Sequence, residues 1–156
     1  MKRATMDLYS SERERMFSMK LDDLVDPFVN AEDGMVYYYR RSTDEIVVLV
    51  NDQFADDDSN DKLAEAIDDN RDDYVSFPTE IDIHDYQIMR DYVDQVADDR
   101  QRERLEQAIS GRGAFRRFRS TIEQLGLLEQ WYDFEAQAYH DMAVEWCHEN
   151  DVPYEE

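Results

Sequence analysis

The chain has 156 residues, enough for one domain with a hydrophobic core, and its 39 acidic and 17 basic residues give a formal net charge of −22. A surface of this sign repels the phosphate backbone, which excludes general nucleic-acid binding by the whole surface. The single cysteine, Cys147, excludes an intrachain disulfide framework and an all-cysteine zinc site.

The acidic residues are mostly aspartates, 24 of 39, and only three of the basic residues are lysines. This composition is typical of a protein adapted to concentrated salt, where screening weakens the repulsion between like charges. An alternative is a nucleic-acid mimic, whose carboxylates take the place of phosphates on a nucleic-acid-binding partner.

Residues 1–18 are polar, and we expect them to be flexible or to begin a short helix at Ser11, which can form a capping box with Glu14. They lack the apolar stretch of a signal peptide, and no run in the sequence approaches the ~18 apolar residues of a membrane span. The sequence therefore predicts a cytoplasmic protein without membrane contact, with a single α+β domain over residues 19–156.

The first regular elements predicted are a short helix and a β-hairpin. The helix follows Met19, and Pro27 is expected to kink or end it; its apolar face holds Leu21, Leu24, Val25 and Phe28. Two β-rich runs, 35–41 and 46–51, are joined by four residues and predict the hairpin. The second run is apolar throughout, which predicts cover on both faces, and residues 74–77 are a candidate third strand at an edge.

An acidic stretch follows the hairpin. Asn60 is expected to cap a helix whose apolar side carries Leu63, Ala66 and Ile67. The three aspartates at 56–58 suggest calcium binding, but the alternating ligands, central glycine and closing glutamate of an EF-hand loop are missing. We therefore interpret residues 54–59 as a solvated acidic loop.

After Pro78 the pattern is helical. The first of these helices is expected to start at a capping Asp82, and the last to run from Leu128 to about Glu149, with Gly126 ending the helix before it. Their expected inner faces comprise Ile83, Tyr86, Met89 or Arg90, Val93, Val96, Leu105, Ile109, Trp131, Tyr132, Tyr139, Met142, Ala143 and Trp146. The predicted fold class is α+β, a small antiparallel sheet of two to three strands followed by a C-terminal helical bundle. If the chain forms a homodimer, we expect the aromatic-rich last helix to provide the contact.

The sharpest local signal is the segment from Gly111 to Arg119, which holds four arginines and no carboxylate in this acidic chain. Apolar side chains recur there at spacings of three and four and predict a buried stripe of Phe115, Phe118, Ile122 and Leu125. The helical step of about 100° then places Arg116 and Arg117 on the opposite, exposed side, and Arg119 at its flank.

Two interpretations of this segment are open. In one, the glycines let backbone N–H groups approach an anion, which would offset the unfavourable placement of arginines in the first turn of a helix. In the other, the glycines separate two helices and the arginines pair with the surplus carboxylates. The lone G-x-G lacks the P-loop and dinucleotide patterns. The candidate binding residues are Gly111, Arg112, Gly113, Arg116, Arg117 and Arg119.

No constellation predicts a metal site, a cofactor or a catalytic residue. Residues 145–148 read E-x-x-H, with Asp141 one turn earlier, but di-iron bundles need this motif twice. Cys147 and His148 do not form a thiol catalyst, since adjacent helical side chains point about 100° apart. We interpret Cys147 as a small core residue.

Three motifs carry a family resemblance: 111–118 (GRGAFRRF), 131–134 (WYDF) and 143–150 (AVEWCHEN). Together with the hairpin they indicate that the chain from about Leu21 to Glu156 resembles Uncharacterised protein family 0158. The chain departs from the family pattern in its first 18 residues, at 54–58 and at 151–152. The resemblance implies no activity and no catalytic residues, because none is assigned to the family.

The predicted function is a non-catalytic cytoplasmic interaction module that contacts an anionic macromolecule through the arginine segment. The acidic remainder of the chain favours a protein over a nucleic acid as the partner. Two alternatives are open. One is an acidic nucleic-acid-mimic inhibitor. The other is an enzyme acting on a small anionic substrate, which would need a pocket joining Arg112 or Arg116 to His84, His140 or carboxylates.

Overall fold

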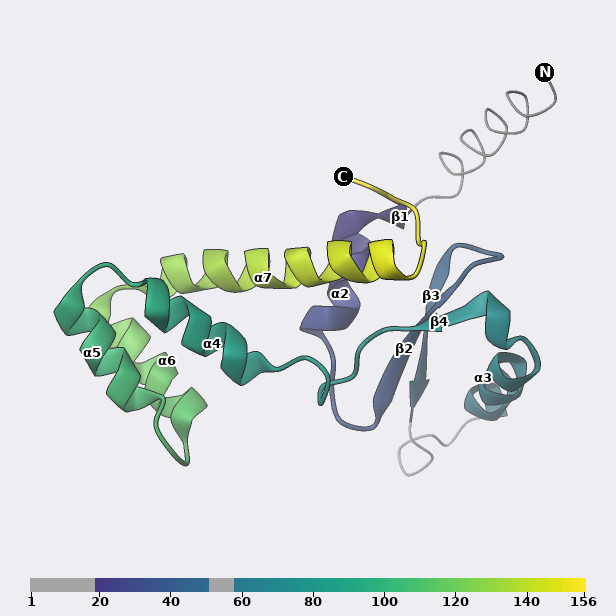
Figure 1. The fold of residues 1–156 in the computed structure, drawn as a ribbon. Coiled ribbons are helices and arrows are strands. Elements are labelled where there is room, and N and C mark those ends of the chain that lie inside the picture. Colours follow the sequence, from purple (N-terminus) through teal and green to yellow (C-terminus); the bar gives the residue numbers. More distant parts are fainter. Residues whose placement is uncertain (1–18, 51–57) are drawn as a thin grey trace, which may run out of the picture. The chain divides into compact units, whose positions relative to one another are not determined.

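The computed structural model describes residues 19–50 and 58–156, and their contacts concentrate in two compact units. The sheet unit comprises the described residues up to Ile83 together with 140–156, and the helical unit comprises 84–139 (Figure 1). The single domain expected over 19–156 stays a prediction. The expected capping box of Ser11 with Glu14, and residues 54–57 of the expected acidic loop, lie outside the described residues. The loop prediction is wrong at Asp58 and Ser59, which belong to the helix that follows.

The sheet confirms the predicted hairpin and third strand. β2 (Met35–Arg40) and β3 (Glu45–Val50) are antiparallel, and β4 (Tyr74–Ser76) pairs antiparallel with the other side of β2. The strand order is β3-β2-β4, so β2 is central and β4 is an edge, as expected. The residues of β3 after Glu45 are half-buried, which corrects the expectation of full cover on both faces.

The helix predicted after Met19 is α2 (Leu21–Val29), which buries Leu21, Leu24 and Phe28. Pro27 lies inside it, two residues before its end, so the helix stops close to the proline as expected. Before α2, the short strand β1 (Met19–Lys20) pairs in parallel with β5 (Tyr154–Glu155) near the C-terminus. This pairing joins the first and the last strand of the described chain within the sheet unit.

The helix α3 (Asp58–Asp69) follows β3, but Asn60 does not cap it. Its side-chain amide instead accepts a hydrogen bond from the N–H of Val50 and donates one to the carbonyl of Val50, both at 2.9 Å. A carboxamide can make both bonds because it carries a donor and an acceptor side by side. Asn60 therefore holds α3 to the end of β3, and the apolar side of the helix is half-buried.

Part of the sheet unit's core is an aromatic cluster reached by α7 (Leu128–Glu149), whose bounds match the prediction. Trp146 of this helix stacks on Phe77 with ring centroids 4.0 Å apart and meets Phe28 edge-on at 6.4 Å. Its indole N–H donates to the carbonyl of Ser76 at 3.1 Å. Cys147 is buried, as predicted, and burial raises the pKa of its thiol to about 11.

The carboxylate of Asp73 closes the turn of the hairpin. It accepts hydrogen bonds from the hydroxyl of Ser42 at 2.7 Å, from the N–H of Ser42 at 2.7 Å and from Nε of Arg40 at 3.1 Å. The hydroxyl of Ser42 first, and then the guanidinium of Arg40, hold the pKa of Asp73 below its ordinary value, against an opposing effect of desolvation.

We therefore predict that, in the acidic range, the free energy of unfolding of Asp73→Asn depends less on pH than that of wild type. A carboxylate with a lowered pKa in the folded state stabilises above its unfolded pKa, near 4, and this contribution is lost as the pH falls through the folded pKa. Urea unfolding between about pH 5 and 2 should show a smaller decrease for Asp73→Asn than for wild type. Asp72→Asn, at the adjacent exposed carboxylate, is the control; equal slopes for all three proteins would contradict the prediction.

The helical unit confirms the predicted bundle. It consists of α4 (Asp85–Gln95), α5 (Asp99–Ala108), α6 (Ala114–Leu125) and the first half of α7. Tyr92 of α4 lies at its centre, with edge-on ring contacts to Phe118 at 6.2 Å and to Trp131 and Phe134 at 5.3 Å each. Leu105 and Ile109 are buried as expected.

Two predictions about α4 are wrong. Asp82 does not cap it, because its carboxylate accepts from the N–H and hydroxyl of Thr79 at 3.1 and 2.9 Å and forms a turn before the helix. The helix begins three residues later, at Asp85. Its buried face includes Ile88 and Tyr92 beside the expected Met89 and Val93, and Tyr86 is 41% exposed.

The predicted buried stripe of α6 is wrong at Phe115, whose side chain is 56% exposed. Ala114, Phe118 and Ile122 are buried and recur every four residues, so they form the inner row of the helix. Phe115 lies at the edge of that row, in the first turn, where it meets Tyr86 edge-on at 6.5 Å. Leu125 is half-buried, and Gly126 ends the helix in a left-handed conformation, as predicted.

Candidate functional site

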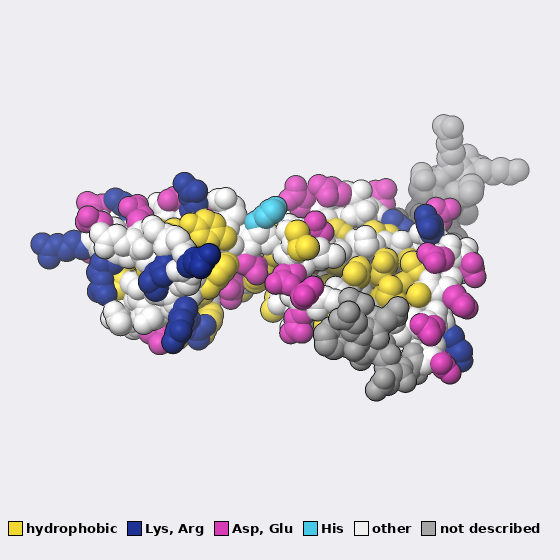
Figure 2. Space-filling model, turned by 90° about the horizontal axis from the view of Figure 1, so that it is seen from below, with side chains coloured by type: hydrophobic (Ala, Val, Ile, Leu, Met, Phe, Trp, Pro, Cys, Tyr) yellow, Lys and Arg dark blue, Asp and Glu magenta, His cyan; other side chains and the backbone are white. Residues whose placement is uncertain are grey.

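The helical unit is much less acidic than the rest of the chain. Residues 84–139 contain 8 basic and 11 acidic side chains, a net charge of −3, whereas the rest of the chain carries −19. Figure 2 shows the arginines of this unit gathered around an exposed apolar surface, while most charged groups on the visible face of the sheet unit are carboxylates. The candidate binding residues therefore lie in the part of the protein that repels anions least.

The two glycines of the arginine segment form a turn between helices. α5 ends at Ala108 and α6 begins at Ala114, and both Gly111 and Gly113 have a positive φ, at 73° and 74°. Glycine adopts this left-handed conformation without the steric cost that a Cβ imposes. The interpretation of the glycines as a separator of two helices thus has direct geometric support.

Arg117 is held by the backbone of this same turn. Its guanidinium donates to the carbonyl of Ala108 at 3.1 Å and also to the carbonyls of Ser110 and Arg112. These carbonyls belong to the C-terminal end of α5 and the turn after it, where the intrahelical bonding pattern leaves acceptors free. Arg117 is exposed, as predicted, but it caps α5.

Arg112 and Arg116 differ from Arg117 in having no such partner. Both side chains are exposed, and no hydrogen bond or ion pair joins either one to the described part of the chain. Arg116 is the third residue of α6, in a first turn without acidic side chains. The helix dipole disfavours a cation there, so an anion bound to Arg116 would relieve an unfavourable interaction.

Arg119 is exposed but tied to its neighbours. Its Nε lies 3.3 Å from a carboxylate oxygen of Glu123, and a terminal nitrogen donates to the hydroxyl of Tyr132 at 2.5 Å. The guanidinium also lies over the Tyr132 ring, 5.3 Å from its centroid. Arg119 is therefore positioned by α7 and keeps donors for a further acceptor.

Three partly exposed aromatic side chains accompany these arginines: Tyr86, Phe115 and Tyr132. We call the set of Arg112, Arg116, Arg119, Tyr86, Phe115 and Tyr132 the arginine surface. Arginine and tyrosine are among the residue types that are enriched where proteins bind each other. Tyrosine and phenylalanine contribute area at a small loss of side-chain freedom, and arginine contributes directional donors.

A pocket of ≈ 240 Å³ opens beside the arginine surface, between α4, α6 and α7. Phe115 and Arg119 belong to both, and the pocket further contains Asp85, Glu135 and Tyr139. Neither Arg112 nor Arg116, nor His84 or His140, lines it. This pocket is therefore not the one that the enzyme alternative requires, which would join Arg112 or Arg116 to His84, His140 or carboxylates.

Sequence reasoning missed Asp85 and Glu135 as pocket residues. Glu135 follows Trp131 by four residues, so it lies on the same face of α7 as a buried tryptophan. That spacing was the signal that could have revealed it. Asp85 could not be found in this way, because its position depends on where α4 begins.

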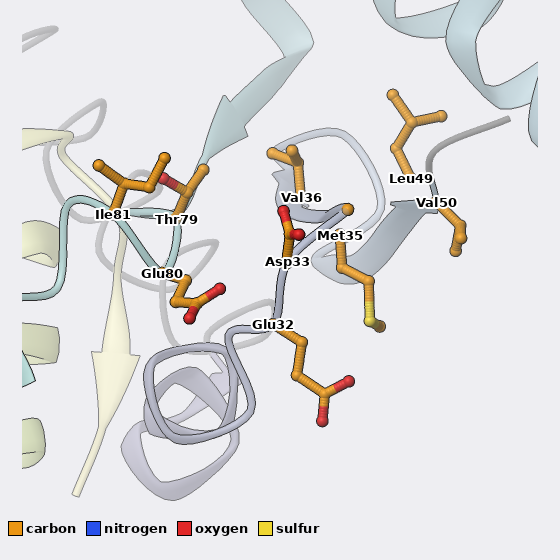
Figure 3. Close-up of a pocket in the computed structure, with 10 residues that line it drawn as sticks. Glu32, Asp33, Met35, Val36, Leu49, Val50, Thr79, Glu80 and Ile81 are labelled. Atoms are coloured by element: carbon orange, nitrogen blue, oxygen red, sulfur yellow. The ribbon is translucent and has the colours of Figure 1, made fainter. Parts of the chain in front are cut away.

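The sheet unit contains a separate pocket of ≈ 340 Å³ at the ends of β2 and β3 (Figure 3). Apolar residues such as Met35 and Val50 line it, together with three carboxylates, Glu32, Asp33 and Glu80. None of the candidate binding residues lies there. Among the described residues, no lysine, arginine, histidine or cysteine lines this pocket beside the carboxylates, so its lining does not indicate a class of ligand.

Among residues 19–50 and 58–156, no three histidine, cysteine, aspartate or glutamate side chains lie close enough together to hold a metal ion. In the E-x-x-H segment, His148 lies 3.2 Å from the hydroxyl of Tyr154. The aromatic residues of α7 also bear on the predicted dimer contact. Trp131, Tyr139 and Trp146 are buried within the chain, as expected, but the prediction is wrong at Tyr132, which was expected on the inner face and is 42% exposed. The homodimer stays a prediction.

Comparison with known proteins gives one match. A family model described as Uncharacterised protein family (UPF0158) matches residues 14–155. Neither a curated protein nor a solved structure matches the chain. In the part of the chain that the structure describes, no helix is both long enough and apolar enough to cross a membrane.

Proposed function

We propose that this chain, which belongs to the Uncharacterised protein family (UPF0158) as its sequence predicted, is a non-catalytic cytoplasmic interaction module. It contacts an acidic region of a partner protein through the arginine surface. The observation that carries this proposal is the state of Arg112 and Arg116, two exposed cations without a described partner in a chain of net charge −22.

The surroundings of these arginines support a protein partner. The adjacent Phe115 is 56% exposed and Tyr86 41%, so apolar area and positive charge lie side by side. An acidic segment with an apolar side chain would cover both, with charge-assisted hydrogen bonds from the guanidinium groups. A nucleic acid would in addition meet the net charge of −19 on the rest of the chain.

The test is affinity purification from the source cells with wild type and with the double variant Arg112→Glu/Arg116→Glu, followed by identification of the bound proteins. We expect partners with acidic segments that the double variant loses. Binding of each purified partner should weaken as salt increases, because the contacts are between exposed charges. Identical partner sets for wild type and the double variant would contradict the proposal.

A charge-matched control is available in the same unit. Arg100 and Arg90 are exposed on α5 and α4 without a described partner, so Arg90→Glu/Arg100→Glu changes the net charge by the same amount as the double variant. Partners that recognise the arginine surface should survive this control. Equal loss with both double variants would mean that net charge alone governs binding, which also contradicts the proposal.

A further inference from the structure

The pocket of the helical unit has a chemistry that differs from the arginine surface beside it. We propose that it binds an organic cation on an alkyl chain, of the kind that a lysine or arginine side chain presents, between the carboxylates of Asp85 and Glu135. The inference does not rest on the acidic partner proposed above, since Arg112 and Arg116 lie outside the pocket.

The walls of the pocket are apolar and largely aromatic. Ile88, Met89, Phe118 and Trp131 line it and are buried, and Phe115 and Tyr139 complete the ring surface. Such walls suit an alkyl chain and the face of a weakly hydrated cation, which aromatic rings attract through their quadrupole.

The polar groups of the pocket leave one of its two carboxylates without a hydrogen-bond partner. Tyr139 donates its hydroxyl to Asp85 at 2.9 Å. Glu135 is half-buried and makes no hydrogen bond or ion pair with the residues that the structure describes. Burial first, and then the negative charge of Asp85, raise the pKa of Glu135, while Arg119 opposes them. A cation entering here would offset both effects.

The balance of charge favours a cation over an anion. Two carboxylates and one guanidinium line the pocket, so its net charge is −1 when all three are ionised. The charge of Arg119 is already shared with Glu123, and one of its donors is taken by the hydroxyl of Tyr132, so the guanidinium only partly compensates the two carboxylates. An anion would therefore meet uncompensated carboxylates at the position where a cation would be stabilised.

The proposal is tested by titrating the full chain with n-butylammonium chloride at constant ionic strength and following the indole N–H resonances by NMR. The two tryptophans make the measurement internally controlled, because Trp131 lines the pocket and Trp146 belongs to the sheet unit. We expect a saturable shift of the Trp131 resonance, with a Kd on the order of millimolar for so small a probe. The Trp146 resonance should stay in place.

Matched variants and probes test whether binding depends on the negative charge of Glu135 and on the positive charge of the ligand. Glu135→Gln, which keeps the shape of the side chain, should weaken n-butylammonium binding by about tenfold or more, whereas Glu129→Gln, at an exposed position of the same helix, should leave it unchanged. n-Butylguanidinium should bind like n-butylammonium. Equal binding of neutral n-butanol or of butyrate, an unchanged Kd in Glu135→Gln, or no Trp131 shift would each overturn the proposal.

Discussion

Replacement of Trp146 by alanine is expected to lower the free energy of unfolding by about 3–5 kcal/mol, the range typical of a buried tryptophan. The side chain stacks on Phe77, meets Phe28 edge-on and donates to the carbonyl of Ser76, so its removal leaves a cavity and an unpaired acceptor. Because it joins α7 to the aromatic cluster, the loss should affect the whole sheet unit.

Chemical denaturation followed by far-UV circular dichroism measures this effect. Glu145→Ala, at the exposed neighbouring residue, is the control and should change the free energy of unfolding by less than about 0.5 kcal/mol. Trp146→Phe should fall between the two, since phenylalanine keeps much of the ring contact but cannot donate to Ser76. A stability of Trp146→Ala equal to that of Glu145→Ala would show that α7 does not anchor this cluster.

A comparison of the two tryptophans also tests the expected single domain. With Trp131 replaced by phenylalanine, fluorescence reports the sheet unit; with Trp146 replaced, it reports the helical unit. If residues 19–156 behave as one domain, each variant should lose its fluorescence signal and its circular dichroism signal at the same denaturant concentration. Two separate transitions would instead identify two independently stable units.

Arg117→Ala is expected to lower the free energy of unfolding by about 1.5–3 kcal/mol, the range for hydrogen bonds to a charged group. The guanidinium donates to three carbonyls at the end of α5 and in the following turn, and alanine leaves them to water. Lysine should restore only part of the loss, because a single ammonium cannot reproduce the spread of donors of a guanidinium.

Arg116→Ala is the matched control, since Arg116 is the adjacent arginine and lacks a described partner. It should change stability by no more than about 0.5 kcal/mol, and alanine in the first turn of α6 removes an unfavourable interaction with the helix dipole. Thermal and urea unfolding of the two variants should therefore separate clearly. Equal stabilities would mean that the carbonyl contacts of Arg117 contribute nothing.

The different roles of these neighbours matter for any functional test. A variant that reverses the charge of both Arg116 and Arg117 would remove a helix cap together with an exposed cation. Loss of binding in such a variant could then come from a loosened turn. Replacing Arg112 and Arg116 leaves the carbonyl contacts of Arg117 intact, because only the backbone oxygen of Arg112 takes part in them.

Several features of the fold could be predicted because they depend on short stretches of sequence. The hairpin follows from two β-rich runs at a short separation, and α7 follows from a long apolar pattern that begins after Gly126. The burial of Cys147 follows from its place on that helix. Such patterns determine the type of element and the side that faces inward, but not the exact edge of the buried area.

The predictions from sequence are wrong at residues for which more than one set of partners is possible. Asn60 and Asp82 both have the composition of helix caps, yet Asn60 binds Val50 of a neighbouring strand and Asp82 binds Thr79 in a turn. Phe115 has the spacing of a core residue, yet Ala114 takes the inner position. In each case the sequence allows both outcomes, and packing against other elements selects one.

By itself, the sequence determined the charge of the chain, the α+β fold class and the concentration of arginine between residues 111 and 119, because these follow from composition and local periodicity. Only the tertiary structure decided what each arginine does. Arg117 reaches the carbonyls of α5 because a two-glycine turn brings the end of that helix to it, whereas Arg116, one helical step of about 100° away, faces solvent. Because of this difference in direction, Arg117 contributes to the stability of the fold, whereas the Arg116 side chain stays exposed and without a described partner.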